Sequence, residues 1–216
     1  MTRAGVVLAV TAGLAVTVGA VMLVRRGRAE ARRRVPELPP PEPGRRRILV
    51  VGDSITVGYL PKFRKLAEAA GHEVIGEGKV SAQTTAIRSL MQPYLKQQPT
   101  DVVVLGGVND LASGVGAFKV NLRLTDLWLD ARKAGARVIA VLVTPWGCYS
   151  RYKAEDTAKV NDFIRKVVGN KAGPDVVVDA SAVLGDAAGC LRFTRDKLHP
   201  NADGQALLAQ AVMNAF

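Results

Sequence analysis

From residue 48 onward, the sequence alternates between short apolar runs and longer stretches with helical spacing. The apolar runs are rich in β-branched residues, and continuous runs of this kind are typical of strands buried on both faces. Strands that alternate with helices predict an α/β fold, a three-layer α/β/α sandwich around a five-stranded parallel sheet. The expected strands are 48–52, 73–76, 101–106, 136–143 and 175–179, and the expected helices are 56–70, 84–97, 115–133, 154–169 and 201–216.

In sheets of this kind the working site lies at the carboxyl ends of the strands, so the residues after each run matter most. Polar or small residues follow all five runs. They are Gly52-Asp53-Ser54, the segments 79–85, 106–110 and 144–150, and a long loop that ends in 195–204. The sequence therefore predicts one polar site built from segments that are far apart in the chain.

Ser54 after the first run is either the N-cap of the next helix or a nucleophile. Asp196 and His199 are three residues apart, a spacing that lets a carboxylate and an imidazole face the same way on a turn. Asp196 would accept the Nδ1 proton of His199, and Nε2 would take a proton from Ser54. The alternative is a solvated loop in which the two residues only cap the last helix. The other histidine, His72, follows a glycine away from this edge.

Two further segments offer hydrogen-bond donors to the same site. Asn109 is either a turn residue or an amide that donates to a developing oxyanion. Gly106 and Gly107 let the backbone approach a ligand closely. The segment Ser81-Ala82 can offer a backbone N–H to the same oxyanion.

Three motifs in this set resemble the conserved blocks of SGNH hydrolases, a subgroup of the GDSL-type esterases and lipases. They are Gly52-Asp53-Ser54, then Gly107-Val108-Asn109-Asp110, then Asp196-Lys197-Leu198-His199-Pro200, in the family's order across residues 48–216. The resemblance implies the flavodoxin-like SGNH hydrolase fold with strand order 2-1-3-4-5. It also implies serine-dependent hydrolysis of a carboxylic ester by a Ser54-His199-Asp196 triad, with no metal or organic cofactor.

The resemblance also implies an oxyanion hole formed by the N–H of Ser54, the Asn109 amide and a glycine N–H. Ala82 stands at that glycine position. Its backbone N–H remains available as a donor unless the site needs positive φ; Gly78 is the alternative donor.

Gly107, Trp146 and Tyr149 are candidate lining residues of a substrate pocket, although Trp146 also suits ordinary loop packing. The substrate is expected to be a small-molecule, glycan or lipid ester. Acetylated sugars, peptidoglycan O-acetyl groups, lysophospholipids and thioesters all remain open.

Two other functions compete with ester hydrolysis. A receiver-like phosphoacceptor domain would use Asp110, Asp53 and Thr144, but no second acidic residue flanks Asp53 and the third motif would be left unused. A catalytically dead SGNH-fold binding module is supported only by the alanine at position 82.

The first 47 residues differ from the rest in composition. Residues 4–24 form 21 uncharged positions, long enough to span a bilayer as a helix. Residues 25–34 hold six Arg, and 35–44 hold five Pro. We expect a transmembrane anchor with a basic collar over 1–34, a proline-rich, basic linker over 35–47 and a hydrolase domain over 48–216. A cleaved signal peptide is the alternative for the apolar segment.

The net charge of +11 is concentrated in this arm, which carries ten Arg against three Glu. The domain is only mildly basic and has no aromatic-basic motif, so nucleic acid is not an expected partner. The expected localisation is single-pass membrane-anchored. The arginine flank favours the cytoplasmic side, and the family resemblance favours the opposite side.

Two cysteines are too few for a disulfide scaffold or a zinc site. In the family's strand order, Cys148 and Cys190 would follow neighbouring strands. They are therefore either a disulfide pair, which would persist in an oxidising compartment, or two unrelated small residues.

Overall fold

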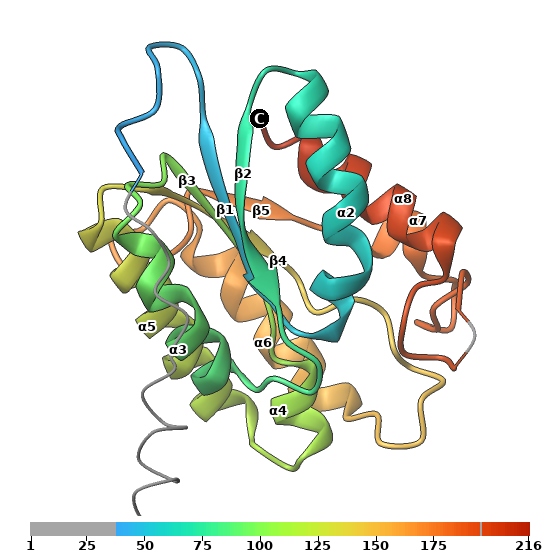
Figure 1. The fold of residues 1–216 in the computed structure, drawn as a ribbon. Helices are drawn as coiled ribbons and strands as arrows, with labels where there is room; N and C mark the ends of the chain where they lie inside the picture. The colour runs from blue at the N-terminus through green and yellow to red at the C-terminus, as the bar shows by residue number, and fades with distance from the viewer. Residues whose placement is uncertain (1–37, 195) are drawn as a thin grey trace, which may run out of the picture. The chain divides into compact units, whose positions relative to one another are not determined.

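A computed structural model describes residues 38–194 and 196–216. These residues form a five-stranded sheet between two layers of helices (Figure 1). The strand order is β2-β1-β3-β4-β5, and every neighbouring pair is parallel. The predicted sandwich and its strand order are confirmed. The strands are β1 (Arg47–Gly52), β2 (Glu73–Gly78), β3 (Asp101–Leu105), β4 (Arg137–Val141) and β5 (Val176–Val178).

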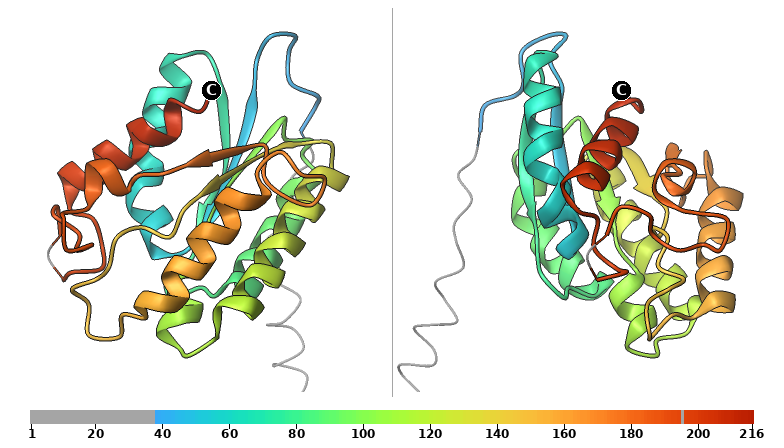
Figure 2. Two further views of the ribbon diagram at one scale, coloured as in Figure 1. Left: turned by 180° about the vertical axis from the view of Figure 1, so that it is seen from behind. Right: turned by 90° about the vertical axis from the view of Figure 1, so that its right-hand side faces the viewer.

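Helices cover both faces of the sheet (Figure 2). One layer contains α2, α7 and α8, and α2 packs on both α8 and strands β1 and β2. The other contains α3, α5 and α6, with the short α4 packed against α5 and α6. The bounds are α2 (Ser54–Ala69), α3 (Thr84–Leu95), α4 (Val108–Ala112), α5 (Ala117–Lys133), α6 (Ala154–Val167), α7 (Ser181–Leu184) and α8 (Ala202–Met213).

The central strands explain the continuous apolar runs of the sequence. Every residue of β1 and β3 is buried, because helices cover both faces of these strands. The edge strands β2 and β5 are only partly buried. Helix α3 continues through Pro93, which lies in its last turn, so the proline does not break the helix there.

The start of the first strand is fixed by ion pairs at the amino-terminal edge of the sheet. Strand β1 begins at Arg47, the last residue of the predicted linker, and this residue is 3% exposed. Its Nε lies 2.7 Å from Glu73, while Arg46 donates to both oxygens of the buried Asp101 at 3.0 Å. The folded unit therefore includes both arginines.

The predicted transmembrane helix requires a correction. In residues 38–194 and 196–216, no helix combines the length and apolarity needed to cross a bilayer. Residues 4–24, where the span was predicted, lie outside the described part of the chain. The structure does not support the membrane anchor or the single-pass localisation, and we withdraw both.

Candidate active site

Ser54 lies at the carboxyl end of β1, as the first residue of α2. The N-cap of this helix is Asp53, whose Oδ1 accepts the N–H of Ile55 at 2.9 Å. The capping role that was one alternative for Ser54 therefore belongs to its neighbour. The half-buried Ser54 places its Oγ 2.8 Å from Nε2 of His199.

His199 and Asp196 form a second close pair on the turn before α8. The imidazole Nδ1 lies 2.6 Å from Asp196 Oδ2. The other oxygen, Oδ1, accepts the N–H groups of Leu198 at 3.0 Å and His199 at 2.7 Å. Partial burial raises the pKa of Asp196, but these hydrogen bonds outweigh it and lower the pKa to about 2. The carboxylate is thus ionised at neutral pH and holds the imidazole with Nε2 toward Ser54.

A second carboxyl group lies next to the serine but is inaccessible. Complete burial raises the pKa of Asp53 to about 7, although the N–H of Ile55 and the charge of His199 act in the opposite direction. Sequence reasoning missed this burial, because a residue that follows a strand in a Gly-Asp-Ser motif reads as a loop residue.

The other candidate donors lie in the loop after β2 and in α4. Asn109 lies in α4, and one N–H of its amide donates to the carbonyl of Ala82 at 3.1 Å. The N–H of Ala82 itself donates to the carbonyl of Lys79 at 3.1 Å. The left-handed residue of this turn is Ser81, with φ 57°, so position 82 does not require glycine.

Asp110, which follows Asn109 in α4, is the centre of a buried hydrogen-bonded cluster. Its carboxylate is 0% exposed and accepts the N–H and hydroxyl of Thr84, each at 2.8 Å. Arg123 of α5 completes the cluster at 2.6 Å. Sequence reasoning did not identify Thr84 or Arg123, because only the fold brings them to Asp110. Asp110, Asp53 and Thr144 are all buried, so the three residues of the receiver-like alternative are closed to a phosphoryl donor.

The three candidate pocket residues differ in how deeply they are buried. Trp146 is fully buried and donates its indole N–H to Thr157 at 3.1 Å. The ring of Tyr149 packs against it, with centroids 6.3 Å apart. Gly107 has φ 112° and is packed so tightly that a Cβ would lie 3.3 Å from Val120. Gly107 and Trp146 are thus buried, whereas Tyr149 is half-buried.

Two cavities, of about 240 and 360 Å³, are not lined by Ser54. Val57, one turn along α2 from the serine, and Val80, in the loop after β2, are exposed apolar side chains. The larger cavity is lined by residues 38–42 with Arg45, Arg47 and Glu73, and the smaller by Thr84, Thr85, Arg88, Arg123 and Asp126.

No group of three or more His, Cys, Asp or Glu side chains within 38–194 and 196–216 is arranged to hold a metal ion.

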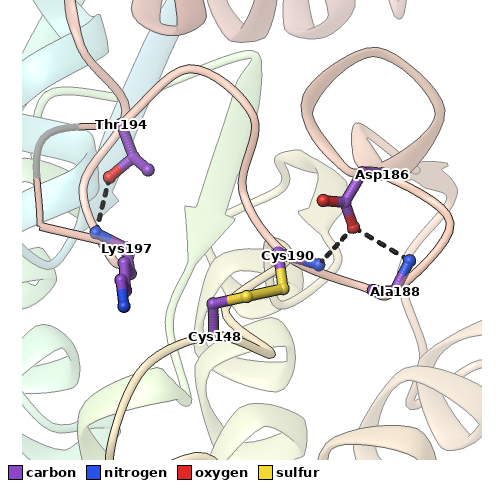
Figure 3. Close-up of a disulfide and its surroundings, with 6 residues drawn as sticks. All are labelled: Cys148, Asp186, Ala188, Cys190, Thr194 and Lys197. Atoms are coloured by element: carbon purple, nitrogen blue, oxygen red, sulfur yellow. Dashed lines mark hydrogen bonds between the residues drawn. A yellow bond between two sulfur atoms is a disulfide. The ribbon is translucent and has the colours of Figure 1, made fainter.

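A disulfide joins the loop after β4 to the loop after α7 (Figure 3). Cys148 and Cys190 have Cα atoms 5.0 Å apart. A backbone hydrogen bond from Gly147 to Gly189, at 2.9 Å, lies beside the bond. The sequence left open whether the two cysteines form a disulfide or are unrelated, and the structure contains the disulfide. It ties the loop of Trp146 to the segment that continues to Asp196 and His199.

Solved structures share this fold at low sequence identity. A GDSL-like lipase from Bacteroides thetaiotaomicron is 16% identical and has a TM-score of 0.69, with 90% of this chain and 95% of that chain covered. A member of the lipolytic G-D-S-L family from Veillonella parvula is 18% identical, with a TM-score of 0.64 and coverages of 79% and 97%. A psychrotrophic esterase from Pseudoalteromonas sp., inhibited by monoethylphosphonate, is 19% identical, with a TM-score of 0.61 and coverages of 78% and 95%.

Among proteins with curated functions, none matches this sequence. The family model of the GDSL-like lipases and acylhydrolases matches residues 50–207, which include all three motifs. With this match over most of its length, the chain belongs to the GDSL-like lipase/acylhydrolase family.

Proposed function

We propose that the protein is a serine-dependent hydrolase of carboxylic esters. The observation that carries the proposal is the hydrogen-bond relay from Ser54 Oγ to His199 Nε2 at 2.8 Å and from His199 Nδ1 to Asp196 at 2.6 Å. A hydroxyl that is hydrogen-bonded to an imidazole, itself oriented by a carboxylate, is the arrangement that activates serine as a nucleophile. Membership of an acylhydrolase family agrees with this chemistry.

In the proposed mechanism, His199 takes the proton of Ser54 while the Oγ attacks the ester carbonyl. The imidazolium that forms is stabilised by Asp196 and then protonates the leaving alcohol. Water repeats the sequence on the acyl-enzyme and releases the acid. Ser54 also lies at the amino terminus of a 16-residue helix, whose dipole favours the negative charge that develops on the substrate oxygen.

Three donors are proposed to hold that oxyanion. The N–H of Ser54 lies in the first turn of α2, where backbone N–H groups have no helical acceptor. The Asn109 amide carries two N–H donors and directs one to Ala82, which leaves the second for the oxyanion. The Ala82 N–H would have to share its hydrogen between Lys79 and the oxyanion, so we rank it third. One donor of this kind is worth about 3–4 kcal/mol in the transition state.

The proposal is tested by labelling the protein with a fluorophosphonate and mapping the adduct by mass spectrometry. The inhibition of the Pseudoalteromonas esterase by a phosphonate supports this choice of probe. We expect one adduct, on Ser54, and its loss in Ser54→Ala and His199→Ala. An adduct on another serine, or no adduct in a protein that hydrolyses p-nitrophenyl esters, would contradict the assignment of Ser54 as the nucleophile. Esters of increasing chain length in the same assay would define the acyl group.

The catalytically dead alternative makes the opposite prediction. A binding module would take up no fluorophosphonate and hydrolyse no ester, although it would fold. Its only sequence support was the alanine at position 82, and the left-handed residue of that turn is Ser81 instead.

A further inference from the structure

The hydroxyl of Thr194 lies at the centre of the turn that carries Asp196 and His199. It accepts the N–H of Lys197 at 2.8 Å, drawn in Figure 3, and the N–H of Asp196 at 3.2 Å. It donates to the carbonyl of His199 at 2.9 Å. A hydroxyl has one donor and two acceptor sites, so these three bonds use its full capacity. The Asp196 carboxylate at 3.4 Å competes for the same proton over a longer distance.

Thr194 and Asp196 both hold the turn through hydrogen bonds to its backbone. Lys197 has φ 67°, a left-handed conformation that a residue with a side chain adopts at a cost. The Thr194 hydroxyl accepts the N–H of this residue. An isolated antiparallel β-bridge between Thr194 and Pro200 brings the two ends of the turn together. Without the hydroxyl, the left-handed residue loses a contact that keeps it in place.

The chain on both sides of Thr194 is held by further bonds, and the turn continues into α8, which packs on the serine-bearing helix α2. Upstream, the disulfide holds Cys190, whose N–H also binds Asp186 at 2.9 Å (Figure 3). Downstream, the N–H of Asn201 donates to the carbonyl of Phe193 at 2.7 Å. The Thr194 hydroxyl therefore links these held segments to the turn that carries Asp196 and His199.

We propose that Thr194 is a positioning residue, whose hydroxyl sets the place of the His199 imidazole relative to Ser54 Oγ. It touches no reacting atom and acts only through the backbone of the turn. The inference rests on the proposed function, because it matters only if His199 is the base. A displacement of the imidazole by about 1 Å can lower a rate by about a hundredfold.

The test compares Thr194→Val, which removes the hydroxyl at nearly constant volume, with Thr194→Ser, which keeps it. We expect kcat for p-nitrophenyl acetate to fall roughly ten- to a hundredfold in Thr194→Val with KM little changed, and to stay within about threefold of wild type in Thr194→Ser. Thr125→Val is the matched control. That residue is also half-buried and donates to a carbonyl at 2.9 Å, but it lies within α5, so its kcat should not change.

Two measurements separate positioning from general stability. Circular dichroism gives the folded fraction used to normalise kcat, and the proton resonance of the His199 Nδ1–H reports the bond to Asp196. We expect this resonance to shift in Thr194→Val and to return in Thr194→Ser. If Thr194→Val does not fold, Thr194→Ala takes its place with the same expectation.

The outcomes distinguish this inference from the proposed function. If Thr194→Val keeps wild-type kcat while His199→Ala is inactive, Thr194 has no positioning role and the proposed function stands. If His199→Ala keeps its activity, the proposed function fails. If neither Thr194→Val nor Thr194→Ala folds, or if Thr194→Ser is as slow as Thr194→Val, the role of the hydroxyl in positioning is overturned.

Discussion

At the scale of single residues, the carboxyl group of Asp53 couples the candidate site to the stability of the fold. Its pKa is about 7 in the folded protein, against 3.8 for an unperturbed aspartate. Between these values the folded state binds a proton that the unfolded state does not bind. The free energy of unfolding therefore falls as the pH rises from about 4 to 7, by roughly 4 kcal/mol from this group alone.

Asp53→Asn should remove that dependence. The amide cannot ionise, and its oxygen still caps α2 by accepting the N–H of Ile55. We expect the free energy of unfolding of the variant, minus that of wild type, to grow by several kcal/mol between pH 4 and pH 7. Urea denaturation at a series of pH values measures this difference, in which the other titrating groups cancel. Parallel curves for the two proteins would contradict it.

The proposed role of Ala82 as an oxyanion donor gives a second prediction at this scale. Ala82→Gly keeps the N–H in a turn whose left-handed residue is Ser81, so activity should stay within roughly a few-fold. Ala82→Pro removes the N–H, together with its bond to Lys79, and should abolish turnover. Steady-state rates on one ester compare the variants. Full activity in Ala82→Pro would show that the N–H of Ala82 is not an oxyanion donor.

Contacts between the candidate site segments were predictable because the carboxyl ends of parallel strands meet at one edge. Ser54 lies in contact with His199, and Asn109 donates to Ala82, in agreement with the expected convergence of these segments. The contacts that could not be predicted depend on packing. The bond from Ala82 to Lys79 follows from the turn geometry, which the residue types alone do not specify.

At the scale of elements, the disulfide should supply a measurable part of the stability. It joins cysteines 42 positions apart, and closing a loop of this length removes about 3–4 kcal/mol of chain entropy from the unfolded state. Reduction by a phosphine should therefore lower Tm by about 10 °C in a domain of this size. The doubly substituted Cys148→Ala/Cys190→Ala protein serves as the control, since its Tm should not respond to the phosphine. An unchanged Tm after verified reduction would show that the bond contributes little.

The long elements were predictable from periodicity, and the short ones were not. The continuous apolar runs of β1 and β3 and the long helices α5 and α6 were placed within about two residues of their observed bounds. The helices α4 and α7 contain five and four residues, too few for a helical period to be visible. No helix was therefore expected at Asn109, which lies in α4.

At the scale of the whole molecule, the folded unit begins before the first apolar residue. Arg46 pairs with the fully buried Asp101, and Arg47 is itself buried against Glu73. A fragment of residues 45–216 should thus unfold with the same free energy as the full chain. A fragment of residues 48–216 leaves Asp101 without its closest charged partner and should lose about 3–5 kcal/mol. Urea denaturation compares the fragments, and equal midpoints would show that the arginines are dispensable.

Composition alone could not predict this boundary. Arg45, Arg46 and Arg47 read as the end of a basic linker, because arginine is rarely buried without a partner and its partners lie far along the chain. The membrane span inferred from the same composition is not supported by any helix in the described residues.

The hydrogen bond between Ser54 and His199 joins residues 145 positions apart. Proteins are synthesised from the amino terminus, so the strand and helix that present the serine leave the ribosome long before the turn that presents the imidazole. A nascent chain therefore carries an unactivated serine until α8, which packs on α2, has been translated. If the proposed mechanism is correct, the protein cannot cleave esters during its own synthesis, and the onset of hydrolysis marks the completion of folding.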